Sequence, residues 1–379
     1  KGMFTVTEGL CVLNPAGDLV PAQYRILSHW PDGSVHWVLT DFQADGPADQ
    51  PLMYSLTHRP NDMAPAHFSP VRLEETDEHI ILDTGRLLFH ISLNNYSLFD
   101  SVSLRNTSNG EHVFTVYEKQ NGSGDAWGKI SEGGSEGGTV RRIYGMGGIC
   151  RASLAPDAYS ATIEEVGPLR TVIRLDGALE ADIPMHHYAG YRPLRCTTRI
   201  YAYAGHAFLR ILHTLIMTCN PRETEIDELA MHIPITLNGP ERRYAYTLNQ
   251  LEQGTLNSGE TLPISQRLDN HVQVHRHQGA VSQVVAEGKR TEGWLTLNDG
   301  ITGLGVAFRH MSEEYPKALE IPVGAEGITA YFWRDPDGKR LSLSRYAEEV
   351  AWHEGEGVYA DGTGLVKTSE CFVCYYEAS

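Results

Sequence analysis

The sequence predicts an all-β protein, with a small N-terminal barrel-like β domain followed by a large antiparallel super-β-sandwich. Three observations carry this prediction. Short apolar segments alternate with period two along most of the chain, and 37 glycines supply turns between them. The 18 tyrosines add to the residues that favour strands. A chain of 379 residues can bury a large core and divides into more than one domain, which we place at residues 1–67 and 68–379.

The N-terminal unit is centred on residues 23–42, which predict two strands joined by a turn at Pro31-Asp32-Gly33-Ser34. Proline presets the first turn position and glycine accepts a positive φ. Trp30 and Trp37 flank this turn. Either indole could stack on a sugar, but their position beside a tight turn favours the core of a small barrel.

From residue 71 the chain predicts a long series of strands. The expected strands fall at 78–86, 87–93, 98–104, 113–118, 161–165, 170–175, 226–237, 272–276, 294–297, 304–309, 328–333 and 372–376. Residues 121–148 contain ten glycines and predict a loop that either faces substrate or lies on the surface. Its candidate substrate-binding residues are Trp127, Lys129, Arg142 and Tyr144. Only residues 311–320 and 342–350 have a helical pattern.

Residues 191–219 hold the densest chemistry in the chain and predict a hairpin that turns at Ala204-Gly205. Arg210 and His213 interrupt its apolar second strand. The segment just upstream packs imidazole, phenol and guanidinium groups together, at His186, His187, Tyr188, Tyr191 and Arg192.

The composition excludes several classes of partner. A formal net charge of −17 without a basic cluster argues against nucleic acid. The chain contains no run of 18 apolar residues, which is the length that a membrane-spanning helix needs. Six scattered cysteines predict neither a disulfide framework nor a metal site, and no cofactor is indicated. A few local arginines can still bind a polyanion on an acidic protein.

Five segments in order resemble the exo-rhamnogalacturonan lyase family and its YetA-like bacterial relatives. They read WPDGSVHWVLTDF, TGRLLFHI, VGPLRTVIRLDG, RIYAYAGHAFLRILHT and GVYADGTGLVKT. The resemblance covers residues from about 20 to 370. One departure is Ser369, where relatives carry a histidine after the Lys-Thr pair. The resemblance also implies a further α-helical domain that this sequence lacks, and that domain would be a partner.

The family resemblance implies cleavage of an acidic pectic backbone by β-elimination. That reaction needs a cation for the uronate carboxylate, a base for the C5 proton and an acid for the leaving oxygen. His213, Arg199, Tyr201 and His187 are our catalytic candidates, and His213 matches the family's recurring His-Thr pair. His186, Tyr188, Tyr191 and Arg192 are candidates for substrate binding.

Plainer interpretations stand beside these. His213 also fits a core histidine, and Tyr201 fits an ordinary strand tyrosine. The competing function is a non-catalytic carbohydrate-binding or architectural portion of a larger carbohydrate-active enzyme. A hydrolase that uses paired carboxylates is a third possibility, but no Asp/Glu pair stands out.

Overall fold

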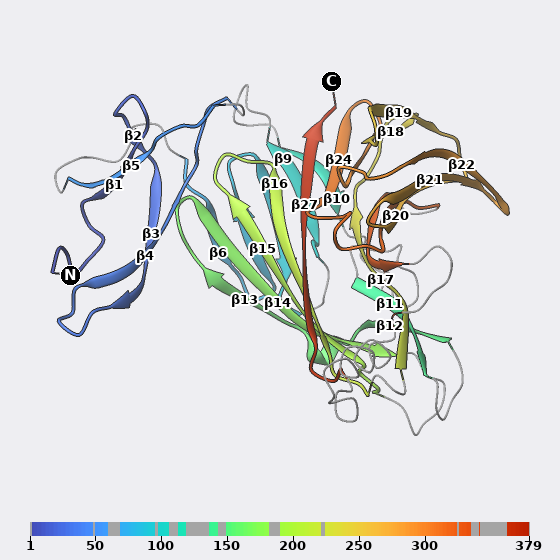
Figure 1. Ribbon diagram of the computed structural model, residues 1–379, viewed down its shortest axis with the longest axis horizontal. Helices are drawn as coiled ribbons and strands as arrows, with labels where there is room; N and C mark the ends of the chain where they lie inside the picture. Colours follow the sequence, from blue (N-terminus) through green and yellow to red (C-terminus); the bar gives the residue numbers. More distant parts are fainter. Residues whose placement is uncertain are drawn as a thin grey trace.

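The computed structural model confirms a chain that is almost entirely β (Figure 1). It describes residues 2–47, 50–59, 69–94, 98–105, 113–118, 136–142, 149–181, 190–220, 224–323, 326–334, 341 and 362–378. Within these ranges the only helical element is a short 3₁₀ turn, η1 (Pro156–Ala158). None of the described helices is long and apolar enough to cross a membrane.

The N-terminal unit forms two small sheets. Strand β1 (Leu10–Leu13) pairs with β2 (Leu19–Val20) and with β5 (Ser55–His58), and β3 (Ala22–His29) pairs with β4 (Val35–Phe42). Gly33 has a φ of 83° in the predicted turn, and the Asp32 carboxylate accepts a 3.0 Å hydrogen bond from the Ser34 amide. Among the described strands none of these sheets closes into a barrel. The expectation that Trp37 lies in a core is wrong, because it is 62% exposed.

A five-stranded antiparallel sheet follows in the chain. Its order is β10-β9-β8-β7-β6. The strands are β6 (Arg72–Glu75), β7 (His79–Asp83), β8 (Leu87–Ser92), β9 (Ser101–Arg105) and β10 (Val113–Glu118). Alternate residues of β7 and β8, such as Ile80, Leu82 and Phe89, are fully buried, because successive side chains of a strand point to opposite faces.

The remaining strands form the two layers of the sandwich. The first layer runs through β13 (Ser160–Glu165), β14 (Arg170–Ala181), β15 (Leu194–Tyr203), β16 (Phe208–Met217), β27 (Val366–Glu377), β24 (Thr302–Phe308), β23 (Trp294–Asn298), β18 (Arg242–Thr247) and β19 (Leu251–Leu256). The second runs through β17 (Thr224–Pro234), β26 (Gly327–Arg334), β25 (Lys317–Ile321), β20 (Glu260–Leu268), β21 (His271–Gln278) and β22 (Val281–Gly288).

Two strands connect the layers. β11 (Glu136–Arg142) pairs with β17 of the second layer, and β12 (Ile149–Leu154) pairs with both β11 and β14. β11 lies inside the glycine-rich segment that we expected to be a loop, so that expectation is wrong for residues 136–142. A strand of this kind was missed because glycine weakens the period-two pattern without preventing backbone pairing.

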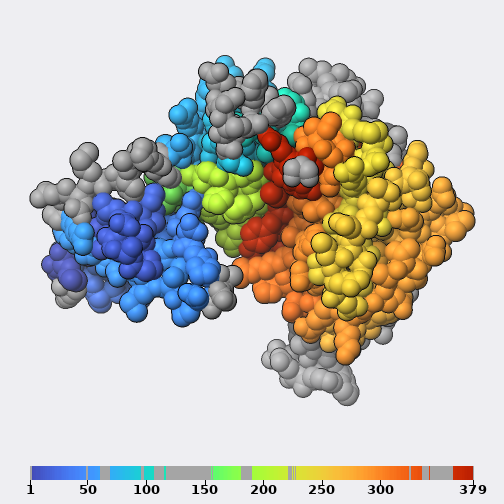
Figure 2. Space-filling model, turned by 90° about the horizontal axis from the view of Figure 1, so that it is seen from above, coloured from blue at the N-terminus to red at the C-terminus, as the bar shows by residue number. Residues whose placement is uncertain are grey.

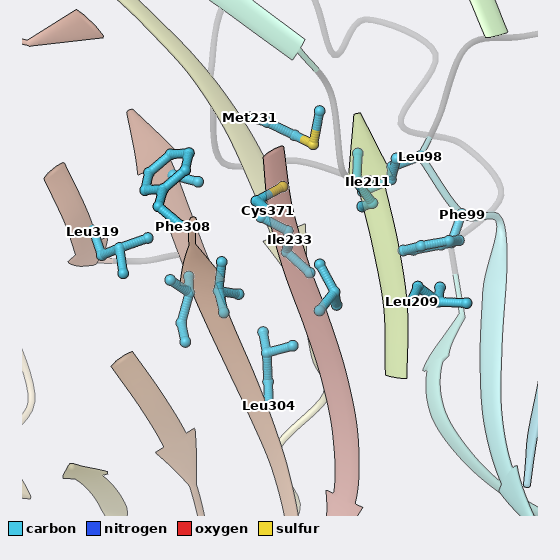
Figure 3. Packing of buried hydrophobic residues seen from close by; sticks show 14 of the residues in the cluster. Leu98, Phe99, Leu209, Ile211, Met231, Ile233, Leu304, Phe308, Leu319 and Cys371 are labelled. Carbon is cyan, nitrogen blue, oxygen red and sulfur yellow. The ribbon is translucent and has the colours of Figure 1, made fainter. Parts of the chain in front are cut away.

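One continuous hydrophobic core joins the five-stranded sheet and both layers (Figure 3). Leu98 and Phe99, just before β9, lie beside Leu209 and Ile211 of β16. Phe99 also makes an edge-to-face contact with Tyr375, with ring centroids 6.4 Å apart. The five-stranded sheet therefore packs on the same face of the first layer as the second layer does.

The helix expected over 311–320 is absent. Residues 311–314 form a turn, and residues Lys317–Ile321 form β25, in which every residue is buried. A short strand that is buried on both faces has no period-two signal, so it cannot be told from a buried helix by periodicity. The second expected helix, at 342–350, lies outside the described residues.

Candidate functional site

The central hairpin β15–β16 presents two different faces. Thr198 pairs with His213 across the strands, and Arg199 pairs with Leu212. Opposed residues of an antiparallel pair share a face, and neighbours along a strand do not. His213 therefore faces the core, whereas Arg199 and Tyr201 face outward. The structure does not bring these catalytic candidates together.

The outward face begins at the junction with the N-terminal unit, where Arg170 is the central cation. Its Nη2 lies 2.8 Å from both carboxylate oxygens of Glu165, and its Nη1 lies 2.7 Å from Oδ1 of Asp41 on β4. The Gln23 side chain accepts hydrogen bonds from the backbone amides of Leu169 and Arg170 and donates one to Glu165. These bonds hold the N-terminal unit against β14.

Tyr201 lies between two guanidinium groups on this face. The Cζ atom of Arg170 is 5.8 Å from the centroid of the Tyr201 ring, and that of Arg210 is 5.1 Å away. Cation–π attraction at such distances fixes the ring and holds positive charge beside it. A phenol in this setting can give or take a proton next to two cations.

A second cluster of charged groups continues across β16 and β27. The Glu370 carboxylate accepts a 2.6 Å hydrogen bond from Nε of Arg210 and a 3.1 Å bond from Nη1 of Arg309. Burial by itself would raise the pKa of Glu370, but the bonds and charges of the two arginines bring it below its usual value. Burial raises the pKa of the neighbouring Tyr203, which also interacts with Arg210.

Arg199 belongs to the same face but lies further along the hairpin. Its Nε and Nη2 donate hydrogen bonds of 2.6 and 3.0 Å to the Glu164 carboxylate. This fork lowers the pKa of Glu164, and it raises the pKa of Arg199. Arg199 is therefore a carboxylate-binding group whose fork is already occupied by a carboxylate of the chain itself.

Figure 2 shows a hollow in front of this face. The N-terminal unit, in blue, stands on one side, and the yellow-to-orange lobe that carries β18–β24 stands on the other. Green and red strands, the colours of β15, β16 and β27, lie between them. We call the outward residues Arg170, Arg199, Tyr201, Arg210, Arg309 and Glu370, together with the partners described above, the outer face.

His213 lies in different surroundings. It is 3% exposed, its Nδ1 is 2.9 Å from Oγ1 of Thr198, and its ring stacks on Phe332 of the second layer with centroids 4.6 Å apart. Its inward position follows from the alternation of β16, whose Leu209 and Ile211 point the same way. Burial between two layers separates this imidazole from the hollow.

Tyr191 and Arg192 precede β15 at the far end of the hairpin. The Tyr191 hydroxyl is hydrogen-bonded to Thr224 at the start of β17. Arg192 donates from Nε to Glu180 at 3.0 Å and also pairs with Asp157 of η1. Both residues thus bind elements of the sandwich to one another.

The other predicted site residues cannot be placed. His186, His187, Tyr188, Trp127, Lys129 and Tyr144 lie outside the described residues, and for Arg142 the structure describes only the backbone, in β11. Sequence reasoning gave no role to Arg170, Arg309 or Glu370. The signal that could have found them is a charged residue in or beside an apolar strand, as at Arg210.

No group of three or more metal-ligating side chains is found in the part of the chain that the structure describes. The cysteines whose side chains the structure describes, all except Cys150, are free thiols. The outer face presents guanidinium, phenol and carboxylate groups.

Comparisons with known proteins identify relatives of this architecture. Residues 71–284, more than half of the chain, match the PcRGLX-like protein central beta sandwich domain. The uncharacterized protein YetA of Bacillus subtilis (strain 168) is 21% identical over 425 residues, which cover 98% of this chain and 46% of YetA. The chain thus spans about half the length of this curated relative.

Solved structures give more distant likenesses. A protein in the glycosyl hydrolase family 38 from Enterococcus faecalis has a TM-score of 0.48 and 10% identity, covering 98% of this chain and 39% of that one. The GH36 alpha-galactosidase AgaB from Geobacillus stearothermophilus has a TM-score of 0.44 and 9% identity, covering 82% and 41%. Likenesses of this degree carry no argument about function.

Proposed function

Because the chain belongs to the PcRGLX-like family through its central β-sandwich domain, we propose that it takes part in cleaving an acidic, rhamnogalacturonan- or pectin-type polysaccharide by β-elimination. The outer face is the proposed site. The observation that carries this proposal is the Tyr201 ring between the guanidinium groups of Arg170 and Arg210.

This arrangement supplies the groups that β-elimination requires. Arginine is suited to a uronate carboxylate because its planar fork binds both oxygens. Once that carboxylate is neutralised, the C5 proton becomes acidic enough for a phenolate or a neutral imidazole to remove. In the proposed mechanism the deprotonated Tyr201 side chain takes the C5 proton and passes it to the leaving glycosidic oxygen, and Arg199 and Arg210 hold the uronate after exchanging their internal carboxylates for it.

The proposal gives His213 no step, because its ring is on the opposite face of the sheet from the hollow. It remains a proposal that His187 contributes a base and that His186, Tyr188, Trp127, Lys129, Arg142 and Tyr144 contact substrate. Tyr191 and Arg192 hold the strand that carries Arg199 and Tyr201 in place.

One observation favours the competing, non-catalytic function. Arg170, Arg199, Arg210 and Arg309 are all paired with carboxylates of the chain. Such pairs rigidify a surface, and a module that binds sugar or supports a larger enzyme has no need to release them. The two functions differ in whether this chain alone produces an unsaturated uronate.

The experiment is a direct assay. Rhamnogalacturonan, other pectins and ulvan are each incubated with the protein, and absorbance is followed in the band of the 4,5-unsaturated uronate. We expect a rise with rhamnogalacturonan or a related pectin. A longer chain that is active while this one is inert would overturn the catalytic proposal for this part and support the non-catalytic one.

A further inference from the structure

A second site, partly open to solvent, lies between the layers, away from the outer face. It is a cavity of about 270 Å³ at the ends of β16 and β27, where β17 and β26 cross over them. Its walls are mainly apolar, with Leu215, Met217, Ile226, Phe332 and Trp333 among the lining side chains. An apolar cavity of this size is a feature of ligand pockets rather than of close-packed cores.

One end of this pocket carries three charged groups, from the turn before β25, from β25 itself and from β27. Lys317, at the start of β25, is only 1% exposed, and its Nζ is 2.5 Å from Oε2 of Glu314 and 3.0 Å from Oγ of Ser369. The other oxygen of Glu314 is 2.8 Å from Nζ of Lys367 on β27. Two ammonium groups facing one carboxylate leave this end with a net positive charge.

Because these groups are partly buried, their net positive charge interacts with an anion more strongly than it would in open solvent. Charges interact more strongly among apolar walls than in water, because the local dielectric is low. The Nζ of Lys317 also lies 4.5 Å from the ring centroid of Phe308, so this ring, Glu314 and Ser369 together fix its position. Lys367 is more open, with 55% of its side chain exposed, and can turn toward a bound anion.

We propose that this pocket binds a small amphipathic monocarboxylate, with its apolar body among the aliphatic and aromatic walls and its carboxylate at the Lys317–Glu314–Lys367 end. A single negative charge matches the net charge of that end, whereas a phosphate dianion exceeds it. A free sugar fits poorly, because most of its hydroxyl groups would meet apolar walls and lose their hydrogen bonds.

The volume sets the size of the ligand. An apolar cavity of about 150 Å³ accepts benzene. The pocket is larger than this and accommodates a phenyl ring with a short chain, which makes 4-phenylbutyrate a suitable probe. Its amide, 4-phenylbutyramide, has nearly the same shape without the charge, and galacturonate supplies a carboxylate on a polar body.

Isothermal titration calorimetry of the protein with these three compounds tests the proposal. We expect 4-phenylbutyrate to bind roughly tenfold more tightly than its amide, as for one charge-assisted bond. Lys367→Gln should remove about the same factor. The matched control Lys289→Gln changes an exposed lysine on another part of the surface and should leave binding unchanged. Leu365→Trp, at a pocket residue that is 41% exposed, should block entry.

Three results would overturn the proposal. The first is no heat from 4-phenylbutyrate at millimolar concentration while near-ultraviolet circular dichroism shows a folded protein. The second is equal affinity for the acid and the amide, or an unchanged affinity in Lys367→Gln. The third is binding of galacturonate that Leu365→Trp abolishes, which would assign the pocket to sugars instead.

Discussion

The two faces of the β15–β16–β27 sheet are built from alternate residues of the same strands, yet their polar groups differ in number and in exposure to solvent. On the outer face, arginines and carboxylates pair at partly exposed positions, as in Arg199–Glu164. On the inner face, a few polar groups are almost fully buried and each has a specific partner, as in His213–Thr198 and Lys317–Ser369. The outer groups lie where solvent reaches them, whereas the inner groups are shielded from solvent by the packing of the layers.

Among substitutions on the two faces, Lys317→Ala should lower the free energy of unfolding the most. Removing one member of a buried ion pair leaves Glu314 without its inner partner and opens space beside Phe308, so the free energy of unfolding should fall by about 3–5 kcal/mol. Urea denaturation measures it. The matched variant Lys367→Ala, at the exposed partner of the same carboxylate, should cost less than about 1 kcal/mol. Similar losses in both variants would contradict the distinction between buried and exposed partners.

His232, buried on the face of β17 opposite Met231 and Ile233, should give an acid-dependent effect. It is 1% exposed, its Nδ1 is 3.1 Å from Oγ1 of Thr329, and burial lowers its pKa from 6.5 to about 4. The unfolded chain therefore takes up a proton before the folded protein does. This contribution to stability is complete above pH 6.5 and is lost as the pH falls to about 4.

The loss from His232 amounts to about 3 kcal/mol across that window. Unfolding free energies at pH 7 and pH 4 should show it as a difference between the wild type and His232→Gln. The variant lacks the titrating ring, so its acid destabilisation should be smaller by this amount. Equal acid destabilisation in the two proteins would show that His232 does not behave as a buried neutral imidazole.

His213→Ala tests the inner face of the central hairpin itself. The change removes a ring packed on Phe332 and the partner of the buried Thr198 hydroxyl, so we expect a loss of about 2 kcal/mol. Any lyase activity should survive at temperatures where the variant is folded. A variant of unchanged stability that has lost its activity would instead make His213 a catalytic residue, as its match to the family motif implied.

Arg199→Ala should give the smallest change in stability. Its ion pair with Glu164 is partly exposed, and pairs of that kind contribute less than about 1 kcal/mol. Thermal unfolding should therefore barely shift, while affinity for acidic oligosaccharide should fall if Arg199 holds a uronate. A loss of several kcal/mol would show that the outer face is structural.

The sequence predicted the fold class well because period-two alternation and turn residues act locally. The turn at Gly33 and the hairpin at Gly205 followed from glycine's tolerance of positive φ, at 83° and 76°. Strand β25 could not be identified, because it is buried on both faces and shows no alternation. Strand β11 could not be identified either, because its glycines weaken the period-two pattern.

The candidate site was only partly predictable. Alternation alone places Arg199 and Tyr201 on one face, but the face of β16 that carries His213 depends on the register with β15, which long-range pairing sets. Lys317 comes together with Ser369 and Lys367 only through the packing of β25 against β27. No local pattern marks such a contact between residues about 50 positions apart.

The most direct test of the central claim is the lyase activity of Tyr201→Phe. This change removes one hydroxyl and keeps the ring between Arg170 and Arg210, so the fold should be undisturbed. We predict a fall in kcat/KM on rhamnogalacturonan of about 10²–10⁴, as for loss of a general acid or base, with an unchanged urea midpoint. Full activity in Tyr201→Phe would contradict the assignment of the outer face as the catalytic site.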